Sequence, residues 1–338
     1  MPLNKTLVVS FMLGVAVIGA FASQANAAAQ EGIVYNPTTG DYTVTYKSGY
    51  SGQLEVVTFI PATKIDPSVK SVYKTVEYIS MSDKGRTVFS YEYKLKNGAK
   101  SQQRINQMIV LVRSLVSGSL ASPEGWPGNA VLSLGGGGVR LSWSTNERGE
   151  LPGLAPGAVL KDMALESLDL PGVTRMEITG NHPITKWMSH YPAGEVGDQM
   201  DLLLNNDFVP RMVAVPRIPV PNPFDAATVL ASLKTHIDQD LVALKLVEPA
   251  LVTELDRWLD AAIAAAKTGN SAALKVDIKE LRKLLKREYE DVDKENAGED
   301  FDDENKNKSA KRQIDKLAAR VLDFDLKYVE RLVKGEKD

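Results

Sequence analysis

The period of the hydrophobic pattern changes once along the chain, and this change constrains the fold more than any other feature. Between about residues 33 and 220, apolar and polar residues alternate in short runs such as 41–47, 53–60 and 85–95, which is typical of half-buried strands. After residue 225 the apolar residues recur every three or four positions, which is typical of amphipathic helices. The sequence therefore predicts two domains, an antiparallel β-sandwich followed by a small C-terminal helical bundle.

A proline-rich segment separates the two patterns. Prolines occupy positions 210, 216, 219, 221 and 223. Because proline has a fixed φ and no backbone N–H, this density predicts a linker over 210–224, between a β-sandwich domain at 28–209 and a helical bundle at 225–338. Few contacts are expected across such a linker, so the two domains are expected to fold independently.

The helical part contains three apolar stripes, at 251–266, 274–285 and 314–332. Each predicts a helix, and a shorter helix is expected at 226–241. No single stripe can be buried by its own helix, so the helices are expected to pack together as a bundle.

The first residues have the pattern of a secretory signal peptide. Lys5 precedes an apolar run at 7–21, and Ala25-Asn26-Ala27 places small residues where signal peptidase cleaves. The sequence predicts a signal peptide at 1–27 and a secreted or periplasmic protein, with an uncleaved N-terminal anchor as the alternative. Since no later stretch is apolar over eighteen residues, we expect no transmembrane segment in the mature chain.

The composition excludes several classes of function. The 338 residues include no cysteine and only three histidines, His182, His190 and His236, which excludes disulfides and thiolate catalysis and argues against sites built on several histidines. Lys and Arg number 40 against 43 Asp and Glu, so there is no basic excess to bind a phosphate backbone. We expect no nucleic-acid partner and no cofactor other than a possible calcium ion.

Turn motifs in the strand-rich part carry a resemblance. They are Ser122-Pro-Glu-Gly-Trp126, Leu141-Ser-Trp143, Gly153-Leu-Ala-Pro-Gly157 and Leu170-Pro-Gly172. In this order they resemble an exported bacterial β-sandwich module, over about residues 72–180. The resemblance implies the fold and no activity. Each Pro-Gly pair is expected to form a turn, and each tryptophan in a strand to anchor the core.

The helical part is similar to another kind of secreted bacterial module. Leu255-Asp-Arg-Trp-Leu-Asp-Ala-Ala262, Lys267-Thr-Gly-Asn270 and Ala318-Ala-Arg-Val-Leu322 resemble the helical FIMAH and FIVAR-type modules found at the C-termini of secreted proteins. This resemblance implies attachment to a cell-surface component or extracellular polymer. The chain departs from these modules by a charged insert at 291–312.

The residues 291–305 form an acidic segment with eight carboxylates. Asp291, Asp293, Glu295 and Asp302 could supply oxygen ligands to calcium. However, the EF-hand template requires glycine at its sixth position, where the chain has Asn296, so we expect a solvated acidic loop of the helical bundle and keep a calcium site as the alternative.

Two tryptophans are candidate binding residues. If Trp126 and Trp187 lie on loops, their rings could stack on sugar rings, and otherwise they are expected to anchor the core. His182 and His190 flank Trp187 and could take part in a metal site, although surface or hydrogen-bonded histidines are the simpler interpretation.

The sequence therefore predicts a non-catalytic exported protein for interaction with the cell surface, the envelope or the extracellular matrix, possibly with glycans. One alternative is an extracellular polysaccharide hydrolase with the helices as an accessory module, because a pair of catalytic carboxylates is defined in space and not along the chain. Another is a structural subunit that polymerises through exposed sheet edges.

Overall fold

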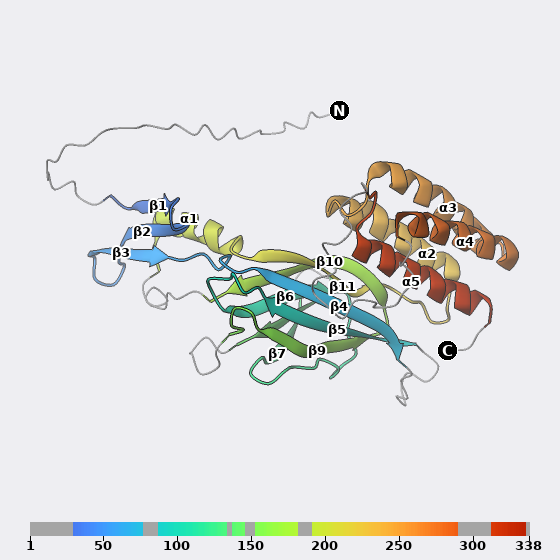
Figure 1. The fold of residues 1–338 in the computed structure, drawn as a ribbon, viewed down its shortest axis with the longest axis horizontal. Coiled ribbons are helices and arrows are strands. Elements are labelled where there is room, and N and C mark those ends of the chain that lie inside the picture. Colours follow the sequence, from blue (N-terminus) through green and yellow to red (C-terminus); the bar gives the residue numbers. More distant parts are fainter. Residues whose placement is uncertain are drawn as a thin grey trace.

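A computed structural model describes residues 30–76, 87–133, 137–145, 153–181, 191–289 and 312–335. The signal-peptide prediction for 1–27 and the acidic segment 291–305 lie outside these residues. The described chain forms sheets in its first two thirds and helices in its last third (Figure 1), so the predicted order of strands and then helices is confirmed.

Two antiparallel sheets make up the sandwich. One has three strands in the order β4-β5-β9 and the other has five in the order β11-β10-β6-β8-β7. The strands are β4 (Pro67–Val76), β5 (Val88–Asn97), β6 (Ile105–Val112), β7 (Gly128–Leu132), β8 (Val139–Ser144), β9 (Val159–Ser167), β10 (Leu170–Gly180) and β11 (Val209–Ile218). The antiparallel β-sandwich predicted from the alternating runs is confirmed.

Aromatic side chains of β5 fill the space between the two sheets. Along this strand every second side chain is buried, which is the pattern that a half-covered strand requires. Tyr93 packs on Trp143 with ring centroids 5.8 Å apart, and its hydroxyl donates to the carbonyl of Ala214 in β11 at 3.1 Å. The buried Tyr91 hydroxyl donates to the carbonyl of Asp169 at 2.6 Å. These tyrosines join the sheets by packing and by hydrogen bonds.

A second, smaller unit lies at the opposite end of the molecule from the helices (Figure 1). Its strands β1 (Gly32–Asn36), β2 (Asp41–Lys47) and β3 (Leu54–Phe59) form a separate antiparallel sheet, covered on one face by helix α1 (Gly194–Asn205). Helix α1 was not predicted from the sequence. Two glycines, Gly194 and Gly197, weaken its helical signal, and its buried face is only Val196, Gly197 and Met200.

The C-terminal helices are the predicted ones. They are α2 (Ala226–Thr235), the π-helical η1 (His236–Leu241), α3 (Pro249–Lys267), α4 (Ser271–Glu288) and α5 (Lys316–Val333). Asp225, Asn270 and Asp315 accept backbone N–H groups at the starts of α2, α4 and α5, as good N-cap residues do. In the described chain, none of the helices has the length and apolar character to span a membrane.

The linker predicted at 210–224 is wrong over its first part. Residues 209–218 form β11, with Pro210 opposite Glu177 and Pro216 opposite Pro171. The prolines are tolerated because β11 is at the edge of its sheet and pairs there with β10 alone, so few ladder hydrogen bonds are lost. The connection to the helices is therefore only 219–225.

The expectation of few contacts between strands and helices is also wrong. One hydrophobic core contains buried side chains of both sheets and of all the C-terminal helices. Helix α5 covers the end of the sandwich where β4 ends and β5 begins. There Phe324 packs edge-on against Tyr73 at 5.1 Å and Phe89 at 6.2 Å, while the Tyr328 hydroxyl donates to Thr87 at 3.2 Å. The helices therefore complete the core of the sandwich.

Candidate functional site

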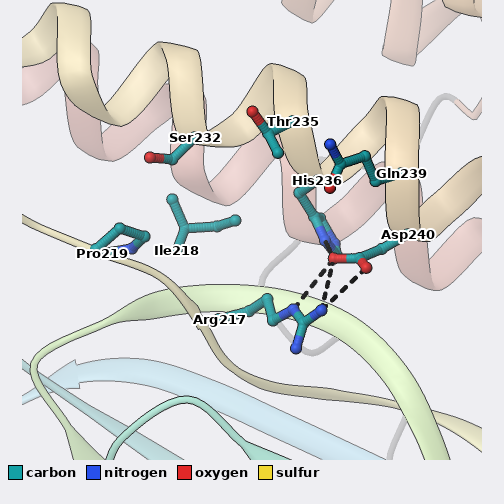
Figure 2. A pocket seen from close by; sticks show the side chains of 8 residues that line it. All are labelled: Arg217, Ile218, Pro219, Ser232, Thr235, His236, Gln239 and Asp240. Carbon is teal, nitrogen blue, oxygen red and sulfur yellow. Dashed lines mark hydrogen bonds and ion pairs between the residues drawn. The ribbon is translucent and has the colours of Figure 1, made fainter. Parts of the chain in front are cut away.

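A shallow pocket opens where the helices meet the larger sheet. It has a volume of about 250 Å³ and lies between the end of β11 and the turn from α2 into η1 (Figure 2). The residues that line it are Arg217, Ile218, Pro219, Ser232, Thr235, His236, Gln239 and Asp240. A π-helical turn is rare and occurs frequently at functional sites, so this junction is a candidate functional site.

A chain of hydrogen bonds crosses the base of this pocket. The backbone N–H of Val173 donates to Nε2 of His236 at 3.0 Å. With Nε2 accepting, the neutral ring carries its proton on Nδ1, which donates to Oδ2 of Asp240 at 2.7 Å. Arg217 completes the arrangement with Nη2 at 2.9 Å from Oδ1 of Asp240 and Nε at 3.1 Å from Oδ2 (Figure 2). We call Arg217, His236, Asp240 and the Val173 N–H the polar clasp.

The polar clasp is electrostatically satisfied. The hydrogen bond from His236 and the positive charge of Arg217 lower the pKa of Asp240, against the opposing effect of burial. His236 is buried, and both of its ring nitrogens are engaged, so the ring has no free nitrogen to take a proton from a bound molecule. The arrangement therefore ties η1 to β10 and β11, and its chemistry is positioning and not proton transfer.

Gly172 allows η1 and β11 to lie close to β10 at this point. A Cβ at this position would lie 2.5 Å from Cβ of Arg217 and 3.0 Å from Nε2 of His236. The Leu170-Pro-Gly172 motif does not form the predicted turn, because its residues begin β10. By contrast, the chain does turn at 123–126, where the Trp126 N–H donates to the Pro123 carbonyl at 3.0 Å. Gly172, the glycine of the fourth motif, therefore serves close packing.

The structure describes only one of the candidate site residues from the sequence. Trp126 is 4% exposed and belongs to the main core, so it presents no ring face to a sugar and the stacking role is wrong for it. Trp187, with His182 and His190, lies outside the described residues, as do Asp291, Asp293, Glu295 and Asp302. Glycan stacking at Trp187 and calcium at the acidic segment stay predictions. Among the described residues, no group of three or more metal-binding side chains is placed to hold an ion.

A second candidate site is the outer face of the β1–β3 sheet. The inner face carries Val44, Tyr46 and Phe59, which pack against α1. The outer face carries the alternate side chains, among them Val34 opposite Thr43 and Thr45 opposite Val56. These four side chains are uncharged, although the same face carries Asp41 and Lys47 at the two ends of β2. Their exposed fractions are large, at 67% for Val34 and 63% for Val56.

Exposed apolar side chains concentrate in this small unit. Of the fourteen large hydrophobic residues that are exposed in the described chain, eight belong to β1–β3, their turn and the region of α1. They are Val34, Tyr35, Tyr50, Leu54, Val56, Tyr191, Leu202 and Leu204. Because scattered exposed residues are normal but a concentration of them is not, this unit is the best candidate for contact with a partner.

Neither site was predicted from the sequence. For the polar clasp one local signal existed, because His236 and Asp240 are four residues apart and would share a helix face. Arg217 and Gly172 join them only through tertiary packing. For the outer face, the alternation in 41–47 and 53–60 predicts which residues share a face, but the covering element that determines the buried face is α1, which was not predicted.

Comparisons with known proteins place the chain in no family. No protein-family model matches it. No curated protein matches it either. Among solved structures, a match is an uncharacterised protein from Nocardia farcinica described as having an immunoglobulin-like fold, 16% identical, with 33% of this chain and 80% of that chain covered and a TM-score of 0.22. With so low a TM-score, the fold description rests on the strand pairings above.

Proposed function

We propose that the chain is a secreted or periplasmic, non-catalytic protein that binds a component of the cell surface, the envelope or the extracellular matrix, possibly a glycan. In this proposal the binding surface is the outer face of the β1–β3 sheet. The sandwich and its helices form the body that carries this sheet at one end (Figure 1).

The observation that carries the proposal is the exposure of Val34, Leu54 and Val56 on one side of a sheet whose other side is covered. Apolar side chains gathered on an exposed face are characteristic of interaction surfaces. Valine has little rotamer freedom to lose on binding, so a partner would meet a surface that is already ordered. An exposed sheet face suits a broad contact and not a small ligand, which would need a concave pocket.

Two features of the sequence support the cellular setting of the proposal. The pattern of 1–27 is that of a signal peptide, which would direct the chain out of the cytoplasm. The helical part resembles modules for attachment to surface components or polymers, as described above. A surface-binding role is compatible with both.

The substitution Val56→Lys is expected to weaken binding to isolated cell envelopes. A charge placed in the middle of an apolar contact must be desolvated, so the dissociation constant should rise about tenfold, equivalent to about 1.4 kcal/mol. Co-sedimentation of the purified mature protein with envelope fractions, peptidoglycan sacculi, cellulose and chitin measures this binding and indicates which polymer is recognised.

Val131→Lys is the matched control, because Val131 is similarly exposed (54%) on the edge strand β7 of the sandwich. It should leave binding unchanged. The proposal fails if the wild-type protein sediments with none of these materials, or if both substitutions weaken binding equally. Release of soluble sugar from any of the polymers would favour the hydrolase alternative instead.

A further inference from the structure

Helix α5 presents an acidic side chain to the core of the sandwich. Asp325 is fully buried, with 0% of its surface exposed, and neither of its carboxyl oxygens has a hydrogen-bond partner among the residues that the structure describes. It follows Phe324 in α5 and lies three residues before Tyr328, and both of these aromatic residues pack on the sandwich. A buried carboxyl group without partners is costly when ionised, because nothing replaces the lost water.

Asp323, two residues earlier, is also fully buried but is paired. Its Oδ1 accepts from Nε of Arg282 at 2.8 Å, and its Oδ2 lies 3.3 Å from Nζ of Lys327. The contrast shows that α5 can bury a charged carboxylate when cations are supplied. Asp325 has no such cation in an ion pair among the described residues.

The titratable groups of the sandwich that face this layer are mostly tyrosines and one further acid. Tyr91 and Tyr93 of β5, Tyr73 of β4 and Asp169 before β10 all lie in this electrostatic neighbourhood. Burial, and then the Asp325 carboxylate, raise the pKa of Tyr91 well above its ordinary value. Asp169 is paired with Arg113, whose Nη1 lies 2.9 Å from Oδ1 of Asp169. An ionised Asp325 would therefore face uncharged tyrosine rings and a second carboxylate, Asp169, that repels it.

We propose that Asp325 makes the docking of α5 on the sandwich sensitive to pH, so that the docked state is favoured in acid and opens as the solution becomes alkaline. The proposal is independent of the binding role of the β1–β3 sheet. It concerns the opposite end of the molecule, where α5 closes the sandwich.

The direction of this pH dependence follows from the state, docked or open, that holds the proton of Asp325 more tightly. Burial raises the pKa of Asp325 well above its ordinary value of 3.8 in the docked state. When α5 separates, the carboxyl group reaches water and returns to that ordinary value. Below it both states hold the proton and pH has no effect. Above it only the open state releases the proton, so the opening equilibrium grows about tenfold per pH unit until the docked-state pKa is reached.

Hydrogen exchange of the full mature chain tests the proposal. Amide exchange rates are compared between the wild type and Asp325→Asn at each pH from 5 to 8, under conditions where exchange reports the opening equilibrium. The ratio at one pH cancels the intrinsic pH dependence of exchange. For peptides of α5 and the start of β5, the ratio of the wild-type rate to the variant rate should rise with pH, by about tenfold per pH unit until the docked-state pKa is reached. For β1–β3 it should stay constant.

Asp198→Asn is the control, because Asp198 is an exposed aspartate on α1. The ratio of the wild-type exchange rate to the exchange rate of this variant should not change with pH in any peptide. If Asp325→Asn does not fold, Asp325→Leu replaces the acid by an apolar side chain of similar size and should give the same contrast. A ratio for α5 that is independent of pH overturns the proposal, and so does an equal rise in all peptides, which would indicate global unfolding and not opening of α5.

Discussion

Phe324→Ala is expected to destabilise the sandwich and the helices together, by about 3 kcal/mol or more, which is the usual cost of truncating a phenylalanine in a core. Phe324 is 8% exposed and belongs to α5, but its ring packs edge-on against Tyr73 and Phe89 of the sandwich. Its removal would leave a cavity between the two layers. Because both layers line the cavity, both should lose stability.

Urea unfolding measures this effect, with the free energy of unfolding as the quantity compared. Phe324→Leu is the control for volume and should cost less, because it keeps an apolar side chain at the contact. If Phe324→Ala lowers the stability of the helices and leaves the unfolding of the strands unchanged, the contact between α5 and the sandwich does not have the role described here.

Gly172→Ala is expected to cost about 3 kcal/mol although it adds only one methyl group. Overpacking costs about 1–3 kcal/mol. A buried N–H that loses its acceptor costs about 1–3 kcal/mol more. The added Cβ would meet Cβ of Arg217 at 2.5 Å and Nε2 of His236 at 3.0 Å. Since Cβ of Arg217 is fixed to the backbone of β11, the strand must shift, and the bond from the Val173 N–H to His236 should break.

The control for this substitution is Gly49→Ala, because a Cβ at Gly49 would have no atom within 4 Å. It should change the midpoint of thermal unfolding little. A crystal structure of Gly172→Ala with the polar clasp intact, or a loss of stability no greater than that of Gly49→Ala, would show that close packing at this glycine is unimportant.

The helices could be predicted because their signal is local. The stripe containing Leu251, Leu255 and Leu259 is buried as its spacing predicts. The strand β11 could not be predicted, because a proline is tolerated only at the edge of a sheet. The edge position of a strand is a property of the assembled sheet. Likewise, the polar clasp needs Gly172, Arg217 and His236 from three separate elements, and no pattern along the chain relates them.

The burial of Asp325 could not be predicted from the sequence either. In the sequence Asp325 is a charged residue within an amphipathic helix, where an acidic side chain is expected to be exposed. The structure buries it because α5 has two apolar faces, one against the bundle and one against the sandwich. The sequence of the helix does not indicate that its second face is covered by the sandwich, because that contact is formed only by tertiary packing.

The most direct measurement is equilibrium unfolding of the wild-type chain followed by two signals, far-ultraviolet circular dichroism for the helices and hydrogen-exchange labelling for β5, β6 and β10. The shared core predicts one midpoint for both signals, because complete unfolding of either layer exposes buried aromatic side chains of the other and destabilises it. Two separate midpoints, with the helices or the strands unfolding alone while the other layer stays protected, would contradict a single cooperative body.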